Sequence, residues 1–153
     1  MLLLTLSLSR SSVNHTKKGT AFETRTVEFL RGALPGSVRV YRPAQRSRLD
    51  VGDIWLGDNV IIQAKDYKTW SRASLQKWIR DARKQAKHAG RDYGVVVVKS
   101  RREAEVSGGS DNESLVFMSG ETFAGLSAEF ATACDRVTEL ETELEVLTGQ
   151  VER

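Results

Sequence analysis

The chain has 153 residues, of which 40% are hydrophobic and 28% are charged, a composition typical of one soluble domain with its own core. Its apolar runs are far shorter than the roughly 20 residues that a membrane-spanning helix needs, so we expect no membrane partner. The single Cys134 excludes an internal disulfide, and with only His15 and His88 in addition a Cys/His zinc site is excluded as well. A lone cysteine fits a reducing compartment, and we expect a cytoplasmic protein.

Charge is divided unevenly along the chain. The net charge is +3, but the segment from Gly120 onward has eight acidic residues and two arginines and carries −6. The first 119 residues therefore carry +9. A body this basic indicates a polyanionic partner, and nucleic acid is the commonest one.

The N-terminal part of the sequence predicts an arm followed by a helix. Residues 1–16 open with MLLLTLSLS, which has no basic segment and no small-residue cleavage site, so we expect a short strand or an arm rather than a signal peptide. A misassigned start codon would give the same pattern. KKGTAFETRTVEFLRGALPG then predicts a helix that begins near Thr20 and ends at Pro35-Gly36. Its apolar stripe has helical spacing and consists of Val27, Leu30 and Leu34. Glu23, one turn before Val27, extends that stripe with a carboxylate.

Strands follow this helix. SVRVYRP (37–43) alternates apolar and polar side chains, and AQRSRLD (44–50) reads as a basic loop. DIWLGDNVIIQAK (53–65) predicts a β-hairpin with its turn at Gly57–Asn59. Because side chains alternate along a strand, Gln63 and Lys65 share one face, and a suitable register places Asp53 beside them.

The second half of the chain predicts a helix, two strands and a helical end. SRASLQKWIRDARKQAKHAG (71–90) has helical periodicity, and the predicted buried face is Leu75, Trp78, Ile79, Ala82 and Ala86. Gln85 lies off that predicted face, and only a contact with a DNA backbone is assigned to it. YGVVVVKS (93–100) is typical of a strand buried on both faces. VSGGSDNES (106–114) predicts a loop, and LVFMS (115–119) a short strand.

A helix begins at GETFAGLSAEFATA (120–133), and residues 129–153 are predicted as an acidic C-terminal helix of their own. Apolar residues recur there with three-four spacing, at Val137, Leu140, Leu144, Leu147 and Val151. This is the spacing of a coiled-coil seam, but about two heptads fit a packing helix and a dimer zipper equally. The order of elements predicts an α/β domain over residues 17–128, with a mixed sheet between helices.

The hairpin has the groups that a hard cation prefers. Mg²⁺ accepts carboxylate, amide and carbonyl oxygens together with water, and Asp53 and Gln63 provide the first two. The Ala64 carbonyl is a further candidate ligand, and Glu23 could join the site directly or through water. Lys65 could orient or deprotonate a water, or stabilise charge on a phosphate.

These residues, in this order, resemble the PD-(D/E)xK nuclease superfamily. The resemblance covers about residues 17–100: a helical Glu23, GDI with Asp53, IIQAK with Gln63 and Lys65, then a helix and a strand. KGTAFETRTVEFLR is most similar to the opening helix of archaeal and phage Holliday-junction resolvases. Two positions depart from the pattern. Gly52 stands where proline often precedes the aspartate, and Gln63 replaces an acidic ligand, as in the QxK variant of Mrr-type nucleases.

The resemblance implies a restriction-endonuclease-like fold and a Mg²⁺-dependent DNA endonuclease, with Mn²⁺ as a substitute ion. Its catalytic residues would be Glu23, Asp53, Gln63 and Lys65. It further implies hydrolysis of branched DNA to 5′-phosphate ends, in a setting such as phage recombination. Symmetric cutting of a four-way junction needs two active sites, so a homodimer is expected.

Basic residues near the hairpin and on the helix of residues 71–90 are the candidate DNA contacts. They are Arg42, Arg46, Arg48, Lys77, Arg80, Lys84 and Lys87. The helical stripe among them also fits an ordinary solvated face. Two other functions stay open: an Mrr-like or RecB-like nuclease acting on linear or modified DNA, and a catalytically silent DNA-binding subunit with the same fold.

Overall fold

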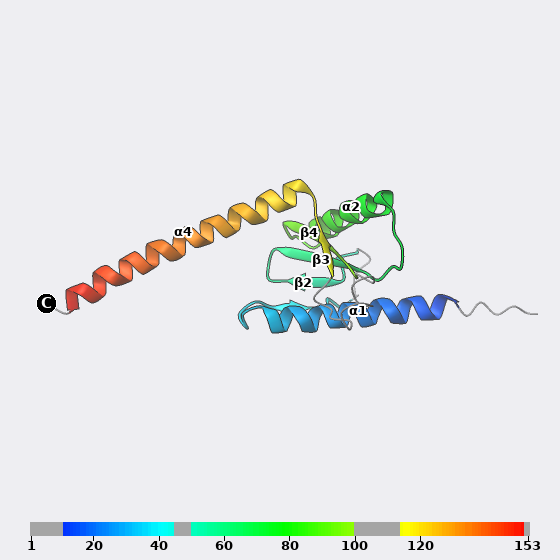
Figure 1. Cartoon of the computed structure of the whole chain (residues 1–153), viewed down its shortest axis with the longest axis horizontal. Helices are drawn as coiled ribbons and strands as arrows, with labels where there is room; N and C mark the ends of the chain where they lie inside the picture. The colour runs from blue at the N-terminus through cyan, green and yellow to red at the C-terminus, as the bar shows by residue number, and fades with distance from the viewer. Residues whose placement is uncertain (1–10, 45–49, 100–113, 152–153) are drawn as a thin grey trace, which may run out of the picture. The chain divides into compact units, whose positions relative to one another are not determined.

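The computed structural model describes residues 11–44, 50–99 and 114–151. Its elements are α1 (Ser11–Ala33), β1 (Val40–Tyr41), β2 (Ile54–Leu56), β3 (Val60–Lys65), α2 (Arg72–His88), β4 (Tyr93–Val98), β5 (Leu115–Phe117) and α4 (Gly120–Val151) (Figure 1). The chain divides between Met118 and Ser119 into two compact units. The part up to Met118 is called the sheet unit, and the part from Ser119, which consists of α4, is called the helical unit.

The sheet unit has one five-stranded sheet whose spatial order follows the chain, β1-β2-β3-β4-β5. β3 and β4 are parallel, and the other three neighbouring pairs are antiparallel. Parallel neighbours need a crossover connection, and α2 provides it. The predicted α/β class with a mixed sheet flanked by helices is therefore confirmed.

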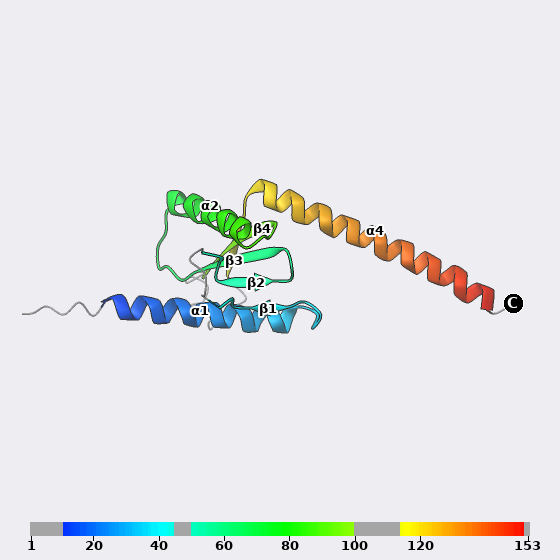
Figure 2. The ribbon, with the colours of Figure 1, turned by 180° about the vertical axis from the view of Figure 1, so that it is seen from behind.

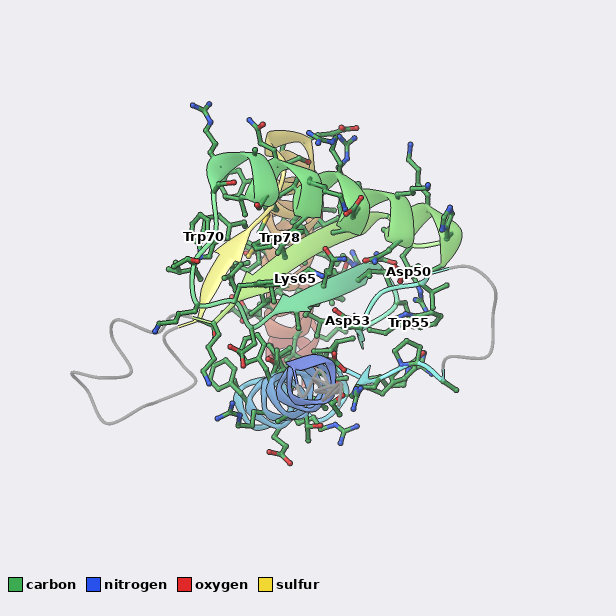
Figure 3. The ribbon with its side chains drawn as sticks, turned by 90° about the vertical axis from the view of Figure 1, so that its right-hand side faces the viewer. Asp50, Asp53, Trp55, Lys65, Trp70 and Trp78 are labelled. Atoms are coloured by element: carbon green, nitrogen blue, oxygen red, sulfur yellow. The ribbon has the colours of Figure 1, made fainter. Side chains whose placement is uncertain are left out.

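The two helices of the sheet unit cover opposite faces of the sheet, as the end-on view in Figure 3 shows. Val97 of β4 packs in a cluster with Phe22 of α1, whereas Val96 and Val98 pack in a second cluster with Ala82 of α2. Alternating side chains of one strand thus enter both cores, as the valine run predicts. The α1-side cluster also contains Val27, Val40, Ile54 and Ile62. Its strand β1 lies beside α1 in the view from behind (Figure 2).

The crossover helix α2 packs unusually close to β4. A Cβ atom at Gly94 would lie 2.3 Å from the backbone of Ala82, so only glycine allows this approach. The N-terminus of α2 is capped by Ser71, whose hydroxyl accepts the Ser74 N–H at 3.1 Å. Close packing and a fixed N-terminus hold α2 against β3 and β4, on the face of the sheet opposite α1.

The predicted β2–β3 hairpin is confirmed. Ile54 pairs with Ile62, Trp55 with Ile61 and Leu56 with Val60. Asp53 lies outside this pairing, since its N–H also donates to the Ile62 carbonyl. The expectation that Asp53 and Gln63 share a face is therefore wrong: Asp53 lies beside Glu23 of α1, whereas Gln63 contacts Trp78 and Gln85 of α2.

Several predicted boundaries differ from the structure. α1 begins at Ser11, so residues 11–16 extend the helix and are not an arm or a strand; residues 1–10 lie outside the described part. The helix does not begin at Thr20, whose carbonyl accepts the hydroxyl of Thr24 one turn later. The predicted strand over 37–43 is reduced to β1, because pairing with β2 covers only two residues. Most of the two predicted loops, 45–49 and 106–113, also lies outside the described residues.

The C-terminal boundary also moves. α4 runs unbroken from Gly120 to Val151, so the acidic part is not a separate segment that begins at residue 129. No helix among the described residues is long and apolar enough to cross a membrane.

Candidate active site

Asp53 lies directly before β2, where the hairpin ladder ends. Its backbone N–H donates to the Ile62 carbonyl at 3.1 Å, and its carboxylate Oδ2 accepts the Ala64 N–H at 2.8 Å. The carboxylate therefore takes the place that the next backbone acceptor of β2 would have occupied. This bond anchors the acid at a fixed point beside β3.

The Ala64 carbonyl lies on the edge of β3 that faces β2, as the Asp53 carboxylate does. The carbonyl of the next residue, Lys65, points toward β4, since it accepts the Lys99 N–H at 3.0 Å. Successive carbonyls of a strand point in opposite directions, so the Ala64 carbonyl points toward the β2 side, beyond the last paired residue of β2. An oxygen with no ladder partner thus lies next to the Asp53 carboxylate.

A cavity of about 360 Å³ opens between α1 and the start of β2. Its lining residues come from α1, from the segment that follows β1 and from the segment before β2, and are Gly19, Thr20, Glu23, Arg42, Pro43, Gly52 and Asp53. Two carboxylates therefore face one space, one from the helix and one from the hairpin. The Arg42 guanidinium forms an ion pair with the Glu23 carboxylate at the edge of this cavity.

Burial raises the cost of ionising both carboxylates, and the charge of Asp53 adds to that cost for Glu23. The pKa of Glu23 is raised above its ordinary value, mainly by burial and then by the charge of Asp53, while Arg42 and Lys65 act against the rise. The pKa of Asp53 is also raised, again mainly by burial, while the Ala64 N–H and the Lys65 ammonium oppose it. A cation in the cavity would relieve both carboxylates at once.

Gln63 faces α2 and is only 6% exposed. With its amide oriented to satisfy its neighbours, its nitrogen donates to the Trp78 carbonyl at 3.2 Å. Its oxygen accepts from Lys65 Nζ at 3.2 Å and from Gln85 Nε2 at 3.1 Å. The amide at position 63 thus holds the lysine ammonium, and both lone pairs of its oxygen are in use. Figure 3 shows Lys65 and Asp53 between the two helices.

The assignment of Gln85 to a position off the buried face was wrong. Gln85 is 4% exposed, and besides Gln63 its Nε2 contacts Asp50 Oδ2 at 2.7 Å. The signal was present in the spacing, since position 85 follows Ala82 by three residues and Trp78 by seven, which is one helix face. Asp50 was not among the predicted site residues. It accepts the Gly52 N–H at 3.2 Å, and its charge is among the causes that raise the Asp53 pKa.

Gly52 explains why proline is absent before the aspartate. Its φ is +84°, whereas the proline ring fixes φ near −65°. A Cβ at this position would also lie 2.2 Å from the Ile61 side chain. The chain therefore enters β2 through a conformation for which glycine is best suited, and the departure from the family pattern has a steric reason.

The predicted basic residues separate into three groups. Arg42 belongs to the cavity itself. Arg46 and Arg48 lie outside the described residues. The four predicted DNA contacts on α2 are all exposed: Lys77, Arg80, Lys84 and Lys87. Of these, Lys77 forms an ion pair with Asp81 at 2.8 Å.

The carboxylates of the cavity are few. Among the described residues, no group of three or more His, Cys, Asp and Glu side chains could hold a metal ion. A Mg²⁺ site does not require such a group, because Mg²⁺ is usually bound by one or two carboxylates and keeps several waters. Glu23, Asp53 and the Ala64 carbonyl fit that description.

In comparisons of the chain with protein-family models, with curated proteins and with solved structures, nothing matches. The likeness to nucleases therefore rests on the residues, their order and their geometry.

Proposed function

We propose that the sheet unit is a Mg²⁺-dependent DNA endonuclease. The observation that carries the proposal is the convergence of Glu23 and Asp53 on one cavity, with the Lys65 ammonium close enough to lower the pKa of both. Two carboxylates and an ammonium around one space are the groups that metal-assisted hydrolysis needs.

Glu23, Asp53 and the Ala64 carbonyl would hold the ion, with water as the other ligands and Mn²⁺ as a substitute. Gln63, the fourth predicted ligand, accepts two hydrogen bonds with its oxygen and would have to release one to bind an ion. Its proposed role is therefore to hold Lys65, and a ligand role for Gln63 is the alternative. Gln63→Glu separates the two, because an added carboxylate strengthens Mg²⁺ binding only if position 63 reaches the ion.

When bound, Mg²⁺ supplies Lewis-acid stabilisation of charge on the scissile phosphate. Lys65 orients the attacking water and assists removal of its proton. The water oxygen forms a bond to phosphorus, the bond to the 3′ oxygen breaks, and that oxygen takes up a proton. The products are a 5′-phosphate and a 3′-hydroxyl. Arg42 at the cavity edge could exchange its bond to Glu23 for the incoming phosphate.

The exposed cations of α2 would contact phosphates without reading sequence. The sheet unit has no separate reading element among its described residues, so recognition of DNA shape fits better than recognition of sequence. We therefore propose branched DNA as the substrate, as in Holliday-junction resolvases, with linear or modified DNA as the alternative.

The test is cleavage of a four-way junction and of linear duplex with identical sequence, with Mg²⁺, with Mn²⁺ and with chelator. We expect metal-dependent cutting of the junction and a loss of about 100-fold or more in Lys65→Ala, the usual contribution of a proton-transferring group. The matched control is Lys68→Ala, which removes an exposed lysine three residues further on. Preferential cutting of linear DNA would favour an Mrr-like or RecB-like enzyme.

A catalytically silent DNA-binding subunit is the second candidate, and the occupied Gln63 oxygen favours it. This candidate predicts salt-dependent DNA binding without metal-dependent cleavage of any substrate. Equal cleavage by wild type and Lys65→Ala would contradict the proposed mechanism.

A further inference from the structure

The helical unit has a continuous apolar stripe that the described structure leaves in solvent. Counting from Phe123, apolar side chains recur every seven residues at Phe130, Val137 and Leu144. A second series, three residues later in each repeat, consists of Leu126, Ala133, Leu140 and Leu147. Because α4 is one unbroken helix, the seam spans nearly four heptads rather than the two visible in the tail alone.

These side chains are exposed to an extent that is unusual for their type. Six of the seven large side chains of the two series are exposed, from 47% at Leu140 to 72% at Phe130, and the seventh, Leu126, is half-buried. An isolated helix in water is marginal, and most helical stability comes from packing of an apolar face. A strict seven-residue repeat is the pattern of a helix that supercoils around another.

We propose that α4 forms a parallel, in-register, two-stranded coiled coil with a second copy of this chain. In heptad notation, Phe123, Phe130, Val137 and Leu144 occupy the a positions and the second series occupies the d positions. Three of the four d positions are leucine and Val137 is β-branched at an a position; leucine at d with a β-branched residue at a is the combination that favours two strands.

The charges beside the seam select the parallel arrangement. In parallel coiled coils, a g residue meets the e residue five positions later in the partner. Arg136 would thus meet Glu141 of the partner subunit, and symmetry gives this attraction twice. The neighbouring g–e pairs have one uncharged member each: Glu129 with Cys134 and Glu143 with Thr148 of the partner subunit.

The antiparallel arrangement with the same overlap is disfavoured. There g residues meet g residues, so Arg136 would face Arg136 of the partner subunit. Glu129 would face Glu143 of the partner subunit, and the reverse pair would repeat this repulsion. Three like-charge pairs replace two attractive ones. Within one chain Arg136 already bonds Glu139 at 2.9 Å on the exposed side, and this bond would loosen or be shared in the dimer.

This inference does not depend on the nuclease proposal, because it concerns only α4. A dimer that cuts no DNA would contradict the nuclease proposal and leave the coiled-coil proposal standing. A monomer that cuts DNA would overturn only the coiled-coil proposal.

The test is the mass of the full chain in solution, by sedimentation equilibrium or light scattering over a concentration series. We expect twice the 17.0 kDa of one chain at micromolar concentration. Leu140→Glu puts a carboxylate in the seam and should raise the dimer dissociation constant by about 100-fold, which corresponds to burying an unpaired charge. Val146→Glu is the matched control, since it has the same charge change on the same helix at an exposed position off the seam.

Orientation is tested by crosslinking in the Cys134→Ser background. Ala133→Cys is a d position, so it faces its own copy only in the parallel arrangement and should form an intermolecular disulfide on oxidation. Arg136→Glu should weaken the dimer by about three- to tenfold, and adding Glu141→Arg should restore it. A monomeric wild type, or equal dissociation of Leu140→Glu and Val146→Glu, overturns the proposal. A stable dimer in which Ala133→Cys fails to crosslink overturns the parallel arrangement.

Discussion

The sheet unit buries two glutamines, Gln63 and Gln85, whereas the helical unit leaves a row of apolar side chains in solvent. Each arrangement has a cost. Buried amides must be fully hydrogen-bonded, and the Oε1 atom of Gln85 has no partner among the described residues. Exposed leucines and phenylalanines lose the free energy that burial would supply. In each unit, the residues that depart from ordinary burial are those to which we assign a function.

The charges of the two units point to different partners. The sheet unit has exposed cations along α2, whereas the helical unit is acidic. Phosphate contacts are therefore expected on the sheet unit alone, since an acidic helix repels DNA. A dimer through α4 would give two candidate sites in one particle, which symmetric cutting of a junction requires, while α4 itself stays off the DNA.

The largest effect is expected from a substitution in the cavity, compared with a substitution elsewhere in the sheet unit. Asp53→Ala should lower metal-dependent cleavage by about 100- to 1,000-fold, the loss typical when one group that stabilises the transition state is removed. It should also abolish thermal stabilisation by Mg²⁺, which in wild type reaches about 2.7 kcal/mol at 100 times the dissociation constant. Calorimetric titration and thermal unfolding measure this. The exposed Asp92→Ala is the control, and equal Mg²⁺ binding in both variants would contradict the site.

The next prediction tests whether the buried amides position Lys65. Gln85→Ala removes a donor to the Gln63 oxygen and to Asp50, so Lys65 loses part of its support. We expect kcat to fall by about 10- to 100-fold, the usual cost of losing an outer partner, with little change in DNA affinity. The matched control is Gln76→Ala, an exposed glutamine of the same helix. If both variants behave alike, Gln85 has no positioning role.

The predictable part of this molecule is the part set by local pattern. The hairpin, α2 and the β4 valine run follow from alternation and helical periodicity, and all three are confirmed. The pairing of β2 with β3 followed from the turn position, because a short turn fixes the register. The position of Asp53 beyond the last pair, with its carboxylate on the Ala64 N–H, did not follow from it.

What could not be predicted depends on long-range packing. The burial of Gln85 depends on Gln63 and Asp50, which lie 22 and 35 residues away in sequence, so a polar residue on an apolar face was taken as exposed. Gly52 has a positive φ and lies so close to Ile61 that a Cβ atom would not fit, and local pattern predicts neither property. The full heptad seam was not predicted either. It requires a single helix that continues through residues 129–137.

A smaller effect contrasts the charges of the two units. Arg80→Ala removes one exposed cation of α2 and should weaken DNA binding by a few fold on every sequence. It should also reduce the slope of log affinity against log salt by about 1. Arg136→Ala, in the acidic helix, should leave both quantities unchanged at equal dimer content. Fluorescence anisotropy over a salt series measures this, and a larger loss in Arg136→Ala would place DNA on the helical unit.

The smallest effect is a pH dependence of stability that belongs to the cavity. Because burial raises the pKa of Asp53, the folded protein keeps this proton to higher pH than the unfolded chain does. The resulting stability is fully present below the ordinary pKa of 3.8 and is lost as the pH rises through the raised value. Without Mg²⁺, Asp53→Asn should therefore gain stability over wild type as the pH rises toward neutrality.

Urea unfolding over a pH series, with and without Mg²⁺, measures that difference. Glu23→Gln should show the same sign, since burial and the Asp53 charge raise the Glu23 pKa above its ordinary 4.5. The exposed Asp92→Asn controls for the loss of one negative charge. Mg²⁺ should cancel the advantage of both cavity variants, because a cation stabilises only the ionised wild-type pair. If the difference in unfolding free energy between cavity variant and wild type is constant across the pH range, ionisation of the two carboxylates does not destabilise the folded protein. The strongest physical reason for a cation in this cavity would then be lost.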